Sequence, residues 1–233
     1  MRYVRDFFRK FKYKIKFFGK KREMDIFYIS NSKISTQLKE LMNHYGSDKG
    51  GMTNHHNFAN YYSEIFNNKK DKIKNFLEIG LGTNNEDLAS NMGKDGKPLA
   101  SLRAWRDYFK NAQIYGADID RDILRDEERI KTFYVDQTNP TSIKDLFTNI
   151  GVNKFDVILE DGLHEYNANI CFFENSIEYL DDQGIYIIED IYYKDQKKFV
   201  NYFSKTSFNF SIIDIFHDKN IANNCILVIK KNG

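Results

Sequence analysis

A short acidic and glycine-rich sequence, Glu78-Ile79-Gly80-Leu81-Gly82, is the part of this chain whose residue types point most directly to chemistry. It ends an apolar run that begins at Phe76, as a buried strand that opens into a tight turn would do. Glycine has no Cβ, so a turn built from it lets the backbone approach a ligand closely. In open α/β sheets a turn at this place binds an adenine cofactor. We therefore predict a cofactor site around Gly80 and Gly82.

The residues around this turn distinguish between two cofactors. A dinucleotide fingerprint needs a third glycine, which is missing after Gly82. Glu78 would repel a pyrophosphate but suits a ligand that carries a sulfonium and an amine. Asp118, at the end of the next predicted strand, can accept hydrogen bonds from ribose hydroxyls, and Asp136-Gln137 follows the third strand, where an adenine amine would lie. Together these residues favour S-adenosylmethionine (SAM) over NAD.

From residue 75 onward, strand-like and helix-like segments alternate, which predicts a parallel sheet with helices on both faces. The expected strands are 76–79, 114–117, 132–135, 155–159 and 184–188, and the expected helices include 99–109, 142–147 and 168–180. The last two apolar runs, 210–216 and 225–229, are too close together for a helical crossover, so we predict that they form an antiparallel hairpin. The expected fold class is therefore α/β, a Rossmann-like sheet with a C-terminal antiparallel hairpin.

The motifs along the chain resemble those of class I SAM-dependent methyltransferases, and more closely those of the metal-dependent sugar O-methyltransferases of the mycinamicin and elloramycin tailoring type. The resemblance covers about 45–190. It is carried by Tyr-Gly-Ser-Asp-Lys-Gly at 45–50, Glu-Ile-Gly-Leu-Gly at 78–82, Ser-Leu-Arg-Ala-Trp at 101–105, Ile-Tyr-Gly-Ala-Asp-Ile at 114–119, Val-Asp-Gln at 135–137, Glu-Asp-Gly-Leu-His at 160–164 and Ile-Glu-Asp at 188–190.

The resemblance implies a metal site and a base. Asp161, Glu189 and Asp190 would bind Mg²⁺ or Mn²⁺, and His164 would accept the proton of the hydroxyl that is methylated. These acids follow two predicted strands and so reach the carboxyl edge of the sheet, where carboxylates that meet need a cation between them. Oxygen ligands suit Mg²⁺, Mn²⁺ or Ca²⁺ better than zinc. The family usually has Asp and Ser where this chain has Glu160 and Leu163, two differences that flank the key residues rather than replace them.

Further residues are assigned to the site by their place in these motifs. Asp48, Lys49 and Ser101 join Glu78, Gly80, Gly82, Asp118, Asp136 and Gln137 as expected cofactor-binding residues, while Tyr166 and Tyr192 are expected to stack on a sugar. The segment 45–51 is predicted to be a flexible loop that closes over the cofactor. His44, His55, His56 and His217 receive no role.

Charge divides the chain into a basic N-terminus and an acidic remainder. Residues 1–22 hold ten Lys or Arg and one acid, whereas 23–233 hold 25 bases and 32 acids. Apolar residues in 1–22 fall near one helical face, which predicts a basic amphipathic helix that contacts a sister subunit, an anionic membrane surface or a glycan. We expect three regions: this helix, a helical cap over 23–72, and a SAM-binding domain over 73–233. Nucleic acid is not an expected partner.

Composition and the apolar segments suggest a cytoplasmic enzyme. No apolar stretch is long enough for a membrane span, and Cys171 and Cys225 are expected to be reduced. We expect a homo-oligomer, placed in the cytoplasm or peripherally at the inner membrane face. The sequence is rich in Lys, Asn, Ile and Phe, which favours a bacterial surface polysaccharide or nucleotide sugar as the acceptor. The alternatives are a catechol or phosphorylated acceptor, an NAD-dependent oxidoreductase, and a non-catalytic scaffold.

Overall fold

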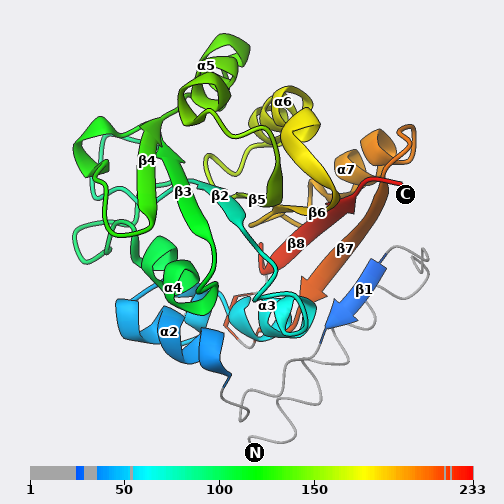
Figure 1. Cartoon of the computed structure of the whole chain (residues 1–233). Helices are drawn as coiled ribbons and strands as arrows, with labels where there is room; N and C mark the ends of the chain where they lie inside the picture. Colours follow the sequence, from blue (N-terminus) through cyan, green and yellow to red (C-terminus); the bar gives the residue numbers. More distant parts are fainter. Residues whose placement is uncertain (1–24, 29–35, 53–54, 218, 221, 233) are drawn as a thin grey trace, which may run out of the picture.

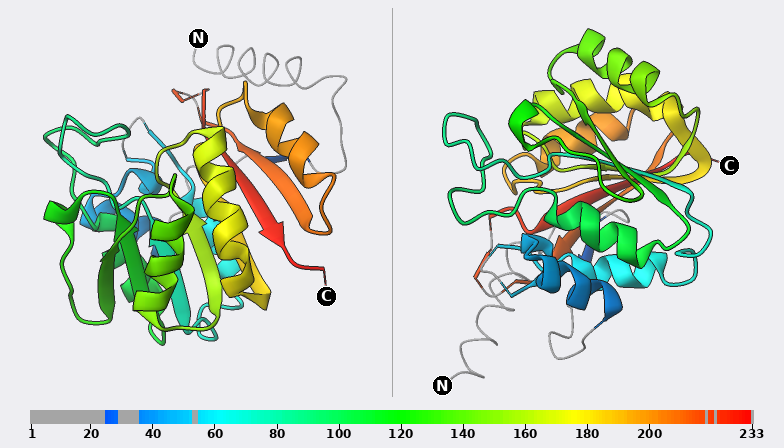
Figure 2. Two further views of the ribbon diagram at one scale, coloured as in Figure 1. Left: turned by 90° about the horizontal axis from the view of Figure 1, so that it is seen from above. Right: turned by 60° about the vertical axis from the view of Figure 1, so that its left-hand side comes forward.

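The computed structural model describes residues 25–28, 36–52, 55–217, 219–220 and 222–232. Within these ranges, eight strands form one sheet in the order β1-β7-β8-β6-β5-β2-β3-β4 (Figure 1). Helices cover both faces of this sheet, with α2, α3 and α4 on one side and α5, α6 and α7 on the other (Figure 2). The predicted α/β fold class, with helices on both faces, is confirmed. The helix predicted for residues 1–22 lies outside the described residues.

The centre of the sheet consists of parallel strands, as predicted. They are β2 (Asn75–Ile79), β3 (Gln113–Asp118), β4 (Ile130–Tyr134), β5 (Phe155–Glu160) and β6 (Leu180–Ile188). β2 pairs in parallel with both β3 and β5, so it occupies the middle of this region. Its burial is nearly complete because helices lie above and below it, which explains its continuous apolar run.

The C-terminal strands form the predicted antiparallel hairpin. β7 (Asn209–Ile215) and β8 (Cys225–Lys230) pair antiparallel, and β8 also pairs antiparallel with β6. The hairpin therefore places β8 between β6 and β7, and it brings the segment before β8 close to the carboxyl end of β6.

The N-terminal region differs from the sequence prediction in one respect. Residues 23–72 are predicted to be helical, but Asp25–Tyr28 form a strand, β1, that pairs in parallel with β7. A strand this short has no periodicity that distinguishes it from a helical turn, and its pairing depends on an edge supplied from the opposite end of the chain. The division of the chain at residue 73 stays a prediction.

The helices pack through two apolar layers, one on each face of the sheet. α2 (Gln37–Tyr45), α3 (Ala59–Phe66) and α4 (Ala100–Tyr108) share one core around Trp105. α5 (Pro140–Ile150), α6 (Tyr166–Ser176) and α7 (Gln196–Phe203) share the other around Phe173. Successive residues of a strand point to opposite faces, so in β5 Val157 enters the first core and Ile158 the second. None of the described helices combines the length and apolarity needed to cross a membrane.

The remaining described elements are short 3₁₀ helices in the connections: η1 (Asp48–Gly50), η2 (Arg121–Ile123) and η3 (Ile177–Tyr179). The first of them corrects a sequence prediction. The segment 45–51 is not a free loop, because Ser47, Lys49 and Gly50 are buried. The reason is long-range pairing of the Lys49 ammonium, which local composition does not reveal.

The glycine turn after β2 is held against the turn after β5. Gly80 has a φ of +84°, and a Cβ added there would overlap the carbonyl oxygen of Asp161. Gly151, which caps α5, has a φ of +71° but has open space around the position of a Cβ.

These two glycines give a matched test of the close approach. Gly151→Ala should lower the free energy of unfolding by about 1–2 kcal/mol, the cost of a left-handed alanine. Gly80→Ala should cost about 1–3 kcal/mol more, because the neighbouring backbone must also shift. Urea unfolding measures both, and equal losses would contradict the close contact between the two turns.

Candidate functional site

A cavity of about 620 Å³ opens at the carboxyl edge of the sheet, where the turns after the parallel strands meet. Most residues that the sequence assigns to a site line it. They are Asp48, Lys49, Gly80, Gly82, Ser101, Asp118, Asp136, Gln137, Asp161, His164, Asp190 and Tyr192. Glu78 and Glu189 lie buried behind its wall. Tyr166 lies elsewhere, since its ring packs edge-on against Phe199 of α7 at a centroid distance of 5.0 Å.

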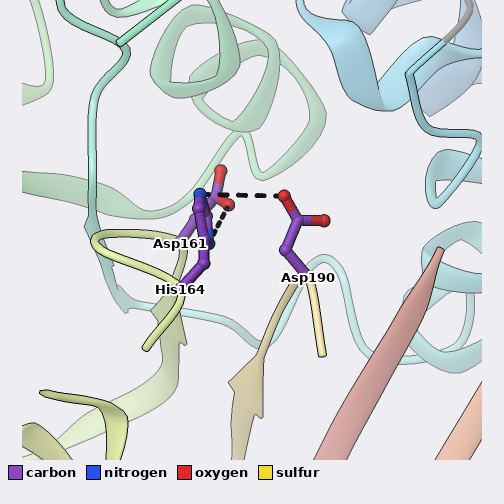
Figure 3. Close-up of side chains that lie close together, drawn as sticks. All are labelled: Asp161, His164 and Asp190. Atoms are coloured by element: carbon purple, nitrogen blue, oxygen red, sulfur yellow. Dashed lines mark ion pairs between the residues drawn. The ribbon is translucent and has the colours of Figure 1, made fainter. Parts of the chain in front are cut away.

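Asp161, His164 and Asp190 come together at one side of this cavity (Figure 3). One potential ligand atom from each lies within 4.8 Å of the others. His164 Nδ1 is 3.9 Å from Asp161 Oδ1, and His164 Nε2 is 3.7 Å from Asp190 Oδ2. Among the described residues, His164 Nδ1 is buried without a hydrogen-bond partner, and the buried Asp190 Oδ1 forms no well-aligned hydrogen bond but lies 3.2 Å from His56 Nε2. Buried polar atoms of this kind fit a site that receives a cation or a ligand.

Glu189 turns away from this group toward the interior. Its Oε2 accepts a hydrogen bond from Lys49 Nζ at 2.5 Å, and its Oε1 accepts one from the Tyr62 hydroxyl at 2.5 Å. Asp190 lies after the end of β6 and has a φ of 55°, so it does not continue the strand geometry, and the two neighbouring side chains reach different partners. The structure thus brings Asp190 to Asp161 and His164, and it joins Glu189 to Lys49.

Lys49 is a buried cation of this site. Its side chain is 3% exposed, and its ammonium donates to Asp161 as well as to Glu189 and lies 3.7 Å from Glu78. Burial alone would lower the pKa of Lys49, but Asp161 and Glu189 outweigh it and raise that pKa well above its usual value. Lys49 therefore stays charged and connects three strand ends, whereas the sequence assigned it to the cofactor.

Glu78 is the most buried of the expected cofactor residues. Neither of its carboxylate oxygens is exposed, and neither has a hydrogen bond from the described residues. Burial raises the pKa of Glu78 to about 7, against the opposing effect of Lys49. A buried acceptor without a donor is costly, so this carboxylate fits a ligand that brings a positively charged group.

Other expected cofactor residues use their polar atoms within the protein. The two oxygens of Asp118 accept backbone hydrogen bonds from Leu81 at 2.6 Å and Asp120 at 2.8 Å. Asp136 accepts from the backbone and hydroxyl of Thr138. These carboxylates therefore shape the loops that line the cavity.

His56 is a site residue to which the sequence analysis assigned no role. Its Nε2 lies 3.2 Å from Asp190 Oδ1, and its Nδ1 lies 3.2 Å from Asn224 Oδ1, just before β8. Burial lowers the pKa of His56 to about 4, so the ring is neutral at pH 7. The only local signal was its place shortly after the 45–51 motif, because Asn224 and Asp190 are remote in sequence.

The chain is 30% identical over 154 residues, which are 66% of this chain and 37% of the relative, to the 8-demethyl-8-alpha-L-rhamnosyl tetracenomycin-C 2'-O-methyltransferase of Streptomyces olivaceus. It is 30% identical over 156 residues, 66% of this chain and 36% of the relative, to the mycinamicin VI 2''-O-methyltransferase of Micromonospora griseorubida. No protein-family model matches the chain.

A solved structure of similar fold has a function that agrees with these relatives. One such structure is that of the methyltransferase MycE from the mycinamycin biosynthetic pathway, solved with Mg and SAH (S-adenosylhomocysteine). It superposes on this chain with a TM-score of 0.58 at 27% identity, over 71% of this chain and 42% of that one. The chain thus has the fold of the class I SAM-dependent methyltransferases, and the relatives that it matches are sugar O-methyltransferases. It spans little more than a third of the length of these curated relatives.

The contacts of Lys49 predict a large loss of stability when its charge is removed. Lys49→Met should lower the free energy of unfolding by about 3–5 kcal/mol, because it leaves buried carboxylates unpaired. Adding Glu189→Gln should recover part of that loss. As a control, Lys131→Met, which removes a pair with Asp126 in which both side chains are exposed, should cost less than about 1 kcal/mol. A double variant no more stable than Lys49→Met would contradict the coupling.

Proposed function

We propose that this chain is a SAM-dependent and divalent-metal-dependent O-methyltransferase that acts on a sugar hydroxyl. The observation that carries the proposal is the group of Asp161, His164 and Asp190 at the carboxyl edge of a methyltransferase sheet. Relatives whose names specify sugar O-methylation support the same reaction class. The NAD-dependent alternative lacks both a third glycine after Gly82 and a relative of that kind among the proteins reported above.

The cofactor would occupy the cavity beside the glycine turn. Gly80 and Gly82 have φ values of +84° and +78°. Glycine adopts these values easily because it has no Cβ, so the turn is tight and leaves room for a ligand. Glu78 supplies buried negative charge for the amine or sulfonium of SAM. The same space is lined by Asp48, Ser101, Asp118, Asp136 and Gln137. Lys49 contributes by holding carboxylates of the site, such as that of Glu189, in place.

A divalent cation fits between the acidic residues. Asp161 and Asp190 would hold it, and Glu189 would be a third ligand after its carboxylate leaves Lys49. Carboxylate oxygens with room for water suit Mg²⁺ or Mn²⁺. When bound, such an ion acidifies a coordinated hydroxyl and orients it.

His164 is the proposed base. A sugar hydroxyl has a pKa of roughly 15–16, as water does, against about 6.5 for histidine, so unassisted proton transfer would cost about 12 kcal/mol. Burial lowers the pKa of His164, so its imidazole is neutral at pH 7 and free to accept a proton. Proton transfer to His164 would accompany attack of the oxygen on the SAM methyl group, and in-line positioning would lower the remaining barrier.

The acceptor is proposed to be a bacterial surface polysaccharide or its nucleotide-sugar precursor. Lys-, Asn-, Ile- and Phe-rich composition and the basic segment 1–22 support this choice over an antibiotic. Tyr192, which is 39% exposed at the cavity, would stack on the sugar. A homo-oligomer, cytoplasmic placement and contact of 1–22 with an anionic membrane surface complete the proposal.

Ligand-induced stabilisation tests the cofactor. S-adenosylhomocysteine (SAH) at 100 times its Kd should add about 2.7 kcal/mol to the free energy of unfolding, which raises the Tm by roughly 5–11 °C for a domain of this size. Mg²⁺ should raise it further, and Asp190→Asn should abolish the Mg²⁺ effect but not that of SAH. A rise with NAD or NADP and none with SAH would refute the methyltransferase proposal.

Substitution of the proposed base tests the reaction. With SAM, Mg²⁺ and a panel of p-nitrophenyl glycosides, including the α-L-rhamnoside, His164→Ala should lower kcat by about 10²–10⁴-fold while SAH affinity is retained. His44, an exposed histidine on α2, provides the control, since His44→Ala should leave turnover unchanged. Undiminished turnover in His164→Ala would remove His164 from the mechanism.

A further inference from the structure

The turn that carries Asp161 and His164 has a backbone conformation that needs support. His164 has a φ of 58°, in the left-handed region that a residue with a Cβ adopts at a cost of roughly 1–2 kcal/mol. Such a conformation persists when the surrounding structure determines it. The residues that hold it come from different elements, and three of them, Gln137, Glu160 and Asn169, are buried.

Gln137 binds this turn through both ends of its side-chain amide. Its Oε1 accepts a hydrogen bond from the backbone N–H of Leu163 at 2.7 Å. A backbone N–H can only donate, so the orientation of the amide is fixed, and its Nε2 points to Glu160 Oε1 at 3.1 Å. A Cβ on Gly162 would overlap Gln137 Oε1, which shows how closely the amide lies on the turn.

Glu160 completes the network from the end of β5. It is fully buried, and its Oε1 also accepts the backbone N–H of Gly162 at 3.2 Å. Its Oε2 accepts a hydrogen bond from Asn169 of α6. On the other side of the turn, Ser90 donates to the carbonyl of Leu163 at 3.1 Å. Glu160 thus supplies acceptors to two side chains and to the turn itself.

We propose that Glu160, acting through Gln137 and the backbone of Gly162 and Leu163, is a positioning residue that fixes the turn presenting Asp161 and His164. The inference rests on the proposed function, which gives these two residues their roles. It also assigns Gln137 to the turn, whereas the sequence assigned it to adenine.

The test uses the full chain without an acceptor sugar and reads hydrogen exchange of 161–165 together with Mg²⁺ and SAH affinity. Glu160→Met keeps the length of the side chain but removes all its acceptors. It should accelerate exchange of the turn, relative to the core of β5 and β6, by about tenfold or more. It should weaken Mg²⁺ binding by about 10–100-fold, as loss of a residue that orients a metal ligand does, and leave SAH affinity within about twofold.

Two further variants separate positioning from general damage. Glu160→Gln should restore the wild-type values, because Gln keeps one acceptor for Gly162 and Gln137, and Asn169 can rotate its amide to accept from the new NH₂ group. Ser176→Ala removes a different buried hydrogen bond of α6, from Ser176 Oγ to the carbonyl of Phe172 at 2.6 Å. It should lower overall stability without changing exchange of the turn or Mg²⁺ affinity.

The outcomes distinguish this inference from the proposed function. Equal exchange of the turn in Glu160→Met and Ser176→Ala would overturn the positioning role. Gln137→Met should behave as Glu160→Met does; weakened SAH binding with an unchanged turn would instead return Gln137 to the cofactor and overturn the inference. Failure of the wild-type chain to bind SAH and Mg²⁺ would refute the proposed function, while exchange of the turn would still report on the network.

Discussion

The buried ammonium of Lys49 is the interaction on which the arrangement of this site depends. It pairs with Asp161 and Glu189 and lies close to Glu78, so it joins the ends of β5, β6 and β2. Buried carboxylates side by side repel one another, and a paired cation makes their approach tolerable. The pairing also draws 45–51 into the interior, which fixes where the chain passes between α2 and α3. The first core layer and the cavity wall are thus coupled through one side chain.

Two residues in left-handed conformations then line the cavity with their side chains. His164 and Asp190 have φ values of 58° and 55°, and they lie in the turns that follow the carboxyl ends of β5 and β6. The turn of His164 is held by Gln137 and Ser90, and the chain after Asp190 is held by the hydrogen bond from Ile191 N to the Cys225 carbonyl at 2.9 Å. The C-terminal hairpin therefore contributes to the site, since it also supplies Asn224 to His56.

Sequence patterns predicted what is periodic or local in this protein. The apolar runs gave the parallel strands, the short gap before Cys225 gave the hairpin, and the strand ends brought Asp161 and Asp190 to one edge. The sequence missed what depends on distant partners: the strand at Asp25–Tyr28, the burial of Lys49 and the contact of His56 with Asp190. Neighbouring residues also diverged, because Glu189 and Asp190 share a motif just after β6 but reach different partners, Tyr62 and His164.

Charge balance connects the two proposed ligands of this site. Glu78, Asp161, Glu189 and Asp190 lie together, and Lys49 alone cannot neutralise them. Burial accordingly raises the pKa values of Glu189 and Asp190 well above the usual range, and that of Glu78 to about 7. A metal ion near Asp190 would favour ionisation of that carboxylate, and the positive charge of SAM near Glu78 would do the same for Glu78. Because these carboxylates repel one another, each bound charge would ease the ionisation that the other requires, so metal and cofactor should favour each other's binding to the same extent.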